Sequence, residues 1–256
     1  MLKEYRPTPI LEPISCSSDD VILVQANPIV INDQCDKTTR QTFISKVYGT
    51  LWCQLFLTSL YIGICNQNHQ IQSFLKSLLG INLMYISFIS LLILSCSLFC
   101  CFESIRKVPY NYLYVIFFTG FMIYSLGYVG IIYNTQSLLL SGISTTGIFS
   151  GLTLYAIQTK VDYTIYGNVM ITLLFGLLFF GFITFAFQIE LLRTFYSVGG
   201  AVIFSFYIVY DTHLIMGGVN RKIQYTTDDF AIASVNLYLD VVNIFLFILD
   251  ILHGRS

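Results

Sequence analysis

Seven long apolar runs are the feature that most constrains how this chain folds. Each run is close to the roughly twenty residues that a helix needs to cross the hydrocarbon core of a bilayer. Backbone polar groups in lipid must be paired within the segment, so runs of this kind cross as helices. We therefore predict an all-α membrane protein with spans at Val47–Cys65, Ile81–Phe102, Tyr112–Ile132, Leu138–Ile157, Asn168–Phe187, Thr194–Ile215 and Ser234–Leu252.

The composition supports this class and excludes others. Hydrophobic residues make up 55% of the 256 residues and charged residues only 11%, whereas an average soluble domain carries about 25% charged residues. The formal net charge of −1 leaves no basic stripe for a nucleic-acid backbone, so no nucleic-acid partner is expected. The lipid bilayer is the partner that the composition predicts.

The chain divides into two regions. Four of the five prolines lie in residues 1–42, a stretch without the basic start and apolar run of a secretory signal peptide. We interpret residues 1–42 as a mobile N-terminal tail and residues 43–256 as a seven-helix transmembrane domain. The loops on the side of the tail, here side A, carry eight lysines and arginines, and the opposite loops carry three. The N-terminus is therefore predicted to be cytosolic, and this count leaves open whether the last segment crosses or dips in and returns.

Cysteines and glycines give two further expectations. The seven cysteines are odd in number and have no C-x-x-C spacing, so neither a disulfide framework nor a zinc site is expected. Cys100 and Cys101 close an apolar run near basic residues, where palmitoylation can occur. Gly147 and Gly151 form a G-x-x-x-G pattern, which we interpret as packing within the bundle rather than as a dimer face.

Three acids lie within the predicted spans: Asp211, Asp240 and Asp250. A carboxylate at membrane depth costs a few kcal/mol, so it normally faces the bundle interior or water. Asp211 and Asp240 lie four and six residues inside side A, which is roughly 6–9 Å at about 1.5 Å per residue. They could therefore meet. Asp250 lies near the end of its span, and we interpret it as an interfacial acid with no special role.

The last segment carries its polar residues on one face. Asn236, Asp240, Asn243, Phe247 and Asp250 are spaced by 4, 3, 4 and 3 residues, which places them along one stripe of a helix. Lipid would be a poor neighbour for such a stripe. We therefore predict six helices around this seventh, central one, with Asn236 and Asn243 as polar support for the acid.

Two carboxylates in contact at low dielectric cannot both ionise easily, and the pair tends to share one proton. Once the proton leaves, the pair attracts a divalent cation, because Ca²⁺ prefers oxygen ligands. Asp211 and Asp240 are thus predicted to form a proton-sensitive, weak Ca²⁺ site, with Ca²⁺ as a permeant ion and no resident cofactor. A purely structural hydrogen-bonded pair is the alternative.

Four stretches of the chain resemble a known family. They are KVYGTLWCQL in the first span, KVPYNYLYVIFFT from Lys107, YIVYDTHLIMGG from Tyr207 and DDFAIASVNLYLDVVNIFLFIL from Asp228. Together they resemble the Bax-inhibitor-motif transmembrane family, specifically its Lifeguard branch. The resemblance implies a multi-pass protein of the endoplasmic reticulum, Golgi or plasma membrane that leaks Ca²⁺, restrains apoptosis and contacts apoptosis regulators or other calcium channels.

The resemblance also assigns roles to residues. The family's pH-sensing acids map onto Asp211 and Asp240, and an acid before the last helix maps onto Asp228, with Asp229 beside it, at the cytosolic mouth. A basic residue that latches the closed state maps onto either Arg106 or Lys107, and both remain candidates.

Other function classes fit less well. A non-conducting adaptor that regulates death receptors or other channels is the main rival, since it would not require the acid pair. An intramembrane serine protease would need Ser150 and His213 at one depth, but they differ by several ångströms, and Ile148 stands where a glycine is required. We therefore do not expect an enzyme. A seven-helix receptor would carry Asp-Arg-Tyr or Asn-Pro-x-x-Tyr motifs, which are missing from the sequence.

Overall fold

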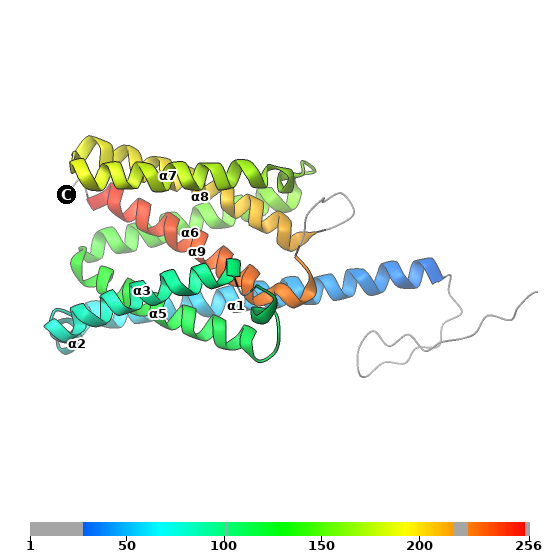
Figure 1. Ribbon diagram of the computed structural model, residues 1–256, viewed down its shortest axis with the longest axis horizontal. Coiled ribbons are helices and arrows are strands. Elements are labelled where there is room, and N and C mark those ends of the chain that lie inside the picture. Colours follow the sequence, from blue (N-terminus) through cyan, green and yellow to red (C-terminus); the bar gives the residue numbers. More distant parts are fainter. Residues whose placement is uncertain (1–27, 101, 218–224, 254–256) are drawn as a thin grey trace, which may run out of the picture. The chain divides into compact units, whose positions relative to one another are not determined.

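The computed structural model describes residues 28–100, 102–217 and 225–253 (Figure 1). Seven helices in these ranges are long and apolar enough to cross a membrane, which confirms the predicted class of all-α membrane protein. The long helices are α1 (Pro28–Gln67), α3 (Leu78–Cys100), α5 (Tyr110–Ile132), α6 (Thr135–Gln158), α7 (Gly167–Phe187), α8 (Glu190–Met216) and α9 (Phe230–His253). Short helices are α2 (His69–Leu75), α4 (Phe102–Ile105), η1 (Tyr163–Tyr166) and η2 (Thr227–Asp229).

Local sequence explains where several helices begin and end. Asn68 precedes α2 and its side chain accepts hydrogen bonds from the N–H groups of Gln70 and Ile71. Asn134 does the same for α6, accepting from the N–H of Ser137 at 2.7 Å. These are N-caps, which satisfy N–H groups that have no partner within the helix. Gly217 ends α8 with a φ of 54°, a conformation that glycine adopts without steric cost.

The chain forms two units, Met1–Thr42 and Phe43–Ser256. Helix α1 begins at Pro28, so residues 28–42 of the predicted tail are helical, and residues 1–27 lie outside the described part. The second unit contains the remainder of α1 and all other helices, and the following description concerns this unit.

Helix α9 lies at the centre of the second unit. Figure 1 shows it between α8 and α6 on one side and α1, α3 and α5 on the other. In its most apolar stretch 61% of the residues are buried, against 11% in α7. One buried apolar cluster joins α9 to Phe43, Val47 and Leu51 of α1, to Tyr114 and Phe118 of α5 and to Leu91 of α3. This arrangement agrees with the predicted central helix.

The length of α9 bears on whether the last segment crosses the membrane fully or dips in and returns, which charge counting left open. Helix α9 is unbroken over 24 residues, or about 36 Å at about 1.5 Å per residue. The hydrocarbon core is roughly 30 Å thick. A segment that dips in and returns would require a break, so the unbroken helix favours a full crossing.

Glycines allow close helix approach at several places but not at the predicted one. A Cβ on Gly200 of α8 would overlap the ring of Phe247 on α9, and a Cβ on Gly127 of α5 would overlap the ring of Tyr61 on α1. Around Gly147 and Gly151 no atom lies within 4 Å of the added Cβ. Our interpretation of this G-x-x-x-G pair as bundle packing is therefore wrong, because both residues face away from the described helices.

Candidate functional site: a buried pair of carboxyl groups

Asp211 of α8 and Asp240 of α9 meet inside the bundle, as the depth argument predicts. Their exposed fractions are 5% and 4%, and a side-chain hydrogen bond joins them. A hydrogen bond between two carboxyl groups requires that one of them carries a proton, because a carboxylate only accepts. The geometry is therefore that of two buried carboxyl groups close enough to share one proton.

Few hydrogen-bond donors near the pair could stabilise a negative charge on it. Among the described residues, no N–H or hydroxyl group donates a hydrogen bond to the buried Oδ2 of Asp240. An ionised carboxylate normally accepts several such bonds when it is buried. The carboxyl group of Asp211 is thus the polar neighbour recorded for Asp240 among the described residues.

Tyrosines surround the acid pair on one side. Tyr207 and Tyr210 on α8 and Tyr225 before α9 each interact electrostatically with Asp211. Burial, followed by the nearby carboxyl of Asp211, raises the pKa of Tyr225 well above its ordinary value. The Tyr225 hydroxyl therefore keeps its proton, and its oxygen accepts a hydrogen bond of 2.9 Å from Asn236 Nδ2. Asn236 thus supports the pair's surroundings from the polar face of α9.

Asn243 does not join this group. Its Nδ2 donates a 2.8 Å hydrogen bond to the carbonyl of Leu239, which satisfies the side chain within α9 itself. The predicted stripe is present, but its polar residues reach different partners rather than one common site.

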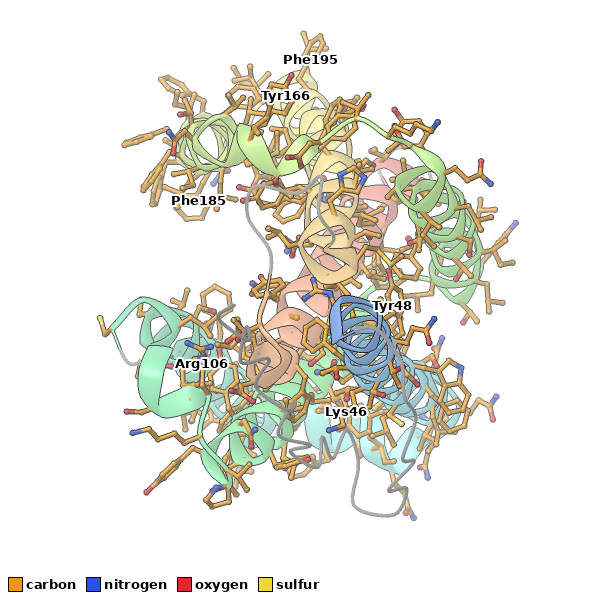
Figure 2. All side chains as sticks on the ribbon, turned by 90° about the vertical axis from the view of Figure 1, so that its right-hand side faces the viewer. Lys46, Tyr48, Arg106, Tyr166, Phe185 and Phe195 are labelled. Carbon is orange, nitrogen blue, oxygen red and sulfur yellow. The ribbon has the colours of Figure 1, made fainter. Side chains whose placement is uncertain are left out.

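The near end of the bundle, where α8 ends and α9 begins, holds an ion pair. Arg106 Nε lies 2.7 Å from Asp229 Oδ1, and Asp229 is only 4% exposed. The same arginine donates a 2.5 Å hydrogen bond to Thr226 Oγ1. Lys107 and Asp228 are exposed. Of the predicted mouth and latch residues, the structure therefore joins Arg106 to Asp229 (Figure 2 labels Arg106).

The residues around Asp229 form a compact cap. Its Oδ2 accepts hydrogen bonds from the backbone N–H of Thr226 at 2.8 Å and from the Thr226 hydroxyl at 2.7 Å. An acid that accepts from the backbone N–H of the residue three positions before it is one half of a capping box, which fixes the start of a helix. Arg106 therefore contacts the start of α9 through two residues, Asp229 and Thr226.

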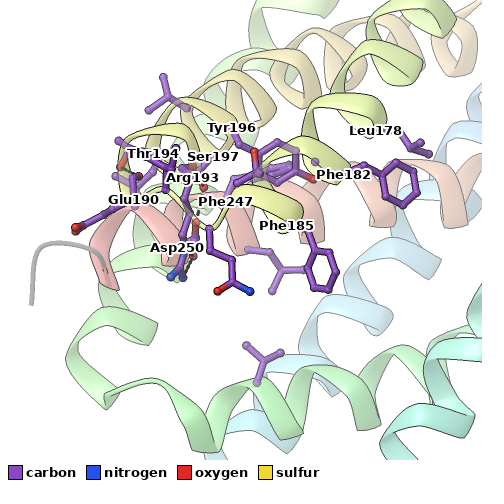
Figure 3. A pocket seen from close by; sticks show the side chains of 18 of the residues that line it. Leu178, Phe182, Phe185, Glu190, Arg193, Thr194, Tyr196, Ser197, Phe247 and Asp250 are labelled. Atoms are coloured by element: carbon purple, nitrogen blue, oxygen red, sulfur yellow. Dashed lines mark hydrogen bonds and ion pairs between the residues drawn. The ribbon is translucent and has the colours of Figure 1, made fainter.

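The far end of the bundle, where α8 begins and α9 ends, contradicts our interpretation of Asp250. Arg193 of α8 forms an ion pair with Asp250 Oδ1, and the Ser197 hydroxyl donates to Asp250 Oδ2 at 2.5 Å. Figure 3 shows this group at a cavity of about 1290 Å³ whose lining includes Phe182 and Phe185 of α7. Asp250 is thus a partner in an α8–α9 contact rather than an interfacial acid without a role.

Uncharged polar pairs lie inside the bundle and were missed by sequence reasoning. Gln54 Nε2 donates to Thr119 Oγ1 at 2.8 Å, and the hydroxyls of Thr58 and Tyr238 are 2.8 Å apart. Both pairs join α1 to a neighbour. Gln54, Thr58 and Thr119 interrupt apolar runs, which was an available signal, but neutral polar residues in spans are common enough that their partners cannot be guessed.

The serine-protease pairing finds no support in the geometry. His213 Nε2 lies 3.0 Å from the carbonyl oxygen of Ala156, and His213 Nδ1 accepts a 3.3 Å hydrogen bond from the backbone N–H of Tyr163. Both ring nitrogens are thus engaged by the main chain, whereas a general base needs one free nitrogen. Ser150 is exposed on α6.

The described cysteines are free thiols, and no metal-binding cluster is found among the searched residues. Cys53, Cys96 and Cys100 are exposed free thiols and Cys65 is a buried one, while Cys101 lies outside the described part. No three His, Cys, Asp or Glu side chains of the searched residues gather closely enough to hold a metal ion. A cation at Asp211 and Asp240 would therefore have only these two carboxylates, which suits weak binding.

The fold and site define a class: a multi-pass α-helical membrane protein whose central helix carries a buried acid beside a second one. Comparison with known proteins places the chain within that class. Residues 40–256 match the family described as inhibitor of apoptosis-promoting Bax1, so the chain belongs to this Bax-inhibitor family, and the resemblance seen in its motifs is confirmed.

Individual relatives agree with this assignment. The chain is 29% identical over 225 residues to protein lifeguard 3 of Homo sapiens, covering 86% of this chain and 71% of that protein. Identity to protein lifeguard 3 of Mus musculus is 27%, with 86% and 72% covered. Bax inhibitor 1 of Schizosaccharomyces pombe is 31% identical, with 86% and 79% covered.

Proposed function

We propose that this protein is a pH-sensitive Ca²⁺ leak channel that modulates calcium homeostasis and restrains apoptosis. The observation that carries the proposal is the hydrogen bond between Asp211 and Asp240 at 5% and 4% exposure. A structural role alone would be filled more cheaply by neutral residues, because burying charge is costly unless it is compensated. The restraint of apoptosis rests on the family description and the names of the relatives.

The pair gives the leak its pH dependence. With one shared proton the pair carries one negative charge and holds α8 to α9. When pH rises and the proton leaves, two negative charges face each other at low dielectric. The repulsion favours separation of the two helices, and the added charge attracts a divalent cation. Ca²⁺ flux should therefore rise as pH rises through the titration of the pair.

The distribution of lysine and arginine between the two sides of the membrane indicates which side faces the cytosol. The side that holds Arg106 and Lys107 also holds most of the other basic residues, so we place it in the cytosol. The membrane is that of the endoplasmic reticulum, the Golgi or the cell surface.

The test is Ca²⁺ flux from liposomes that contain the purified protein, measured between pH 6 and pH 8. We expect the wild type to pass more Ca²⁺ at the higher pH, and Asp211→Asn and Asp240→Asn each to flatten this dependence, since a single acid cannot share its proton. Glu190→Gln is the control, because it removes an exposed acid that lies outside the acid pair and the cytosolic mouth. Flux equal to wild type in both pair variants at every pH would sink the mechanism.

A second candidate is the non-conducting adaptor. The ion pair between Arg106 and Asp229 and the ion pair between Arg193 and Asp250 favour it, since both lock α9 in place without needing a permeant ion. Absence of flux from wild-type liposomes at all pH values, with the protein folded, would favour this reading.

A further inference from the structure

Two aromatic rings lie between the acid pair, Asp211 and Asp240, and the far end of the bundle. Phe204 of α8 precedes Asp211 by seven residues. Phe247 of α9 follows Asp240 by the same number. Seven residues are about two helical turns, so each ring lies on the same face of its helix as the acid, roughly 10 Å nearer the far end. The rings therefore belong to the α8–α9 contact in which the acids meet.

The measured ring contacts agree with this placement. The ring centroids of Phe204 and Phe247 are 5.9 Å apart, and we call these two residues the ring pair. The ring of Tyr196 packs edge-on against Phe247 at 5.4 Å. Phe247 also lies against Gly200, where a Cβ would overlap its ring. Phe204 is 9% exposed, so the bundle encloses its ring.

Polar groups lie on both sides of the ring pair. Toward the near end, the ring of Tyr207 lies 5.7 Å from that of Phe204, and Tyr207 interacts electrostatically with both acids of the pair. Toward the far end, Phe247 lines the cavity of about 1290 Å³ that Arg193 and Asp250 also line (Figure 3). The ring pair is thus an apolar layer between two buried acids and a cavity with charged groups on its wall.

Tyrosines from α1, α8 and the segment before α9 surround these groups. They are Tyr196 beside the ring pair, and Tyr48, Tyr207, Tyr210 and Tyr225 beside the acid pair. The ring pair itself has no group that titrates. A change of pH can therefore act on it only through the spacing of α8 and α9, which ionisation of both acids would increase.

Apolar constrictions close ion pathways, because water leaves a narrow apolar passage and an ion cannot follow without its hydration. We propose that Phe204 and Phe247 form a hydrophobic gate between the acid pair and the far-end cavity. The structure shows this gate closed, with the two rings in contact. When the two acids repel each other, α8 and α9 separate, the rings part, and hydrated Ca²⁺ passes between the cavity and the acid pair. The gate rests on the proposed function, whereas the barrier to water does not.

Ca²⁺ flux from liposomes at pH 6 tests the gate in the condition that keeps it closed. Phe247→Ala removes one ring, so we expect flux at pH 6 to rise roughly tenfold, toward the wild-type level at pH 8. Phe247→Leu keeps an apolar side chain in the constriction and should stay near the wild type. Phe204→Ala opens the same layer from α8 and serves as the test if Phe247→Ala does not fold in detergent. Wild-type flux in the folded alanine variants would overturn the gate.

Phe245→Ala is the matched control for this measurement. Phe245 is the same residue type on the same helix and is also half-buried, but it lines a different cavity, between α1 and α6. Its loss removes the same side chain away from the ring pair, so flux at pH 6 should equal that of the wild type. A rise equal to that of Phe247→Ala would show that any loosening of α9 increases flux, and would overturn the gate.

Access of a charged thiol reagent tests the barrier to water without Ca²⁺. In a variant whose cysteines are replaced by serine, Thr194→Cys places a thiol on the cavity wall. Asn243→Cys places one between Asp240 and Phe247 on α9. In lipid nanodiscs, which leave both ends of the bundle open to water, we expect a charged methanethiosulfonate to modify the first quickly and the second slowly. Adding Phe247→Ala should speed the second reaction roughly tenfold, and adding Phe245→Ala should not.

The outcomes separate the gate from the channel. Fast modification of Asn243→Cys with Phe247 in place would overturn the barrier and with it the gate. Slow modification of Thr194→Cys would show that water does not fill the cavity, and would overturn the gate as well. If Phe247→Ala speeds the modification of Asn243→Cys while wild-type liposomes pass no Ca²⁺ at any pH, the channel is contradicted and the barrier to water stands.

Discussion

Asp240 and Asp250 lie on one face of α9, but different neighbours compensate the cost of burying their carboxyl groups. Asp240 faces a second buried carboxyl group, that of Asp211, and two such groups can compensate each other only by sharing a proton. Asp250 faces the guanidinium of Arg193 and the hydroxyl of Ser197, so its partners are a cation and a hydrogen-bond donor. The first arrangement suits a switch, and the second suits a constant contact between α8 and α9.

At the residue scale we expect Asp250→Asn to lower stability. The variant removes an ion pair whose arginine is 49% exposed, so the loss is about 1 kcal/mol, near the upper range for exposed pairs. Chemical denaturation in detergent measures this change. Glu190→Gln is the control, because it removes an exposed acid at the same end of α8 and should change stability little. A loss of equal size in both variants would point to overall charge rather than to the ion pair.

The sequence could predict the Asp211–Asp240 meeting but not the Asp250 contact, for a physical reason. Depth below a membrane surface follows from residue counting, and both acids of the pair are far in sequence from any lysine or arginine. Arg193 lies just outside the apolar run that begins at Thr194, so it looked like a loop cation. Its direction toward α9 depends on how α8 and α9 cross, which no pattern within one helix reveals.

At the element scale, the crossing of α8 and α9 depends on Gly200. A Cβ there would overlap the ring of Phe247, while Gly199 has no atom within 4 Å of an added Cβ. We expect Gly200→Ala to lower stability by about 1–3 kcal/mol, the usual cost of overpacking. Gly199→Ala should be neutral or stabilising, because alanine favours helices over glycine by about 1 kcal/mol. Equal effects of the two variants in denaturation would contradict this packing.

The second prediction at this scale concerns the start of α9. Arg106→Ala removes the contact with Asp229 and Thr226, so the near end should open more often. We expect Ca²⁺ flux below pH 6.5 to rise about two- to fivefold, since a partly exposed ion pair contributes up to about 1 kcal/mol. Lys107→Ala is the matched control, as Lys107 is the exposed neighbour. The latch would be disproved if the two variants gave the same flux.

Choosing between Arg106 and Lys107 was beyond the sequence, because adjacent residues share composition, depth and charge. The structure separates them through the turn between α4 and α5, which directs Arg106 toward Asp229 and leaves Lys107 exposed. The same applies to the G-x-x-x-G pair. The two glycines would allow another helix to approach closely. Whether a helix lies against them depends on the tertiary structure, which the pattern does not show.

At the scale of the whole molecule, apolar run length was the reliable guide. All seven predicted spans appear as helices, and the structure extends most of them by several residues, as with Ser234–Leu252 within Phe230–His253. The extensions mix apolar with polar residues, as Ala231 and Ile232 do with His253 in α9, because the backbone remains helical beyond the most apolar stretch. Centrality of α9 could also be predicted, since a polar stripe on an apolar helix excludes lipid contact.

The last prediction is the orientation of the whole bundle. Lys107 near the start of α5 and Gln188 at the end of α7 are exposed and lie at opposite ends of the bundle. In a variant whose cysteines are replaced by serine, a single Lys107→Cys or Gln188→Cys provides a label site for a maleimide that cannot cross membranes. The excess of lysine and arginine on the near side predicts that this side is cytosolic. In sealed microsomes with the cytosolic face outward, we therefore expect Lys107→Cys to be labelled and Gln188→Cys to be labelled only after the membrane is permeabilised. The opposite pattern would reverse the orientation, and it would place the Arg106–Asp229 contact on the lumenal or outer side of the membrane.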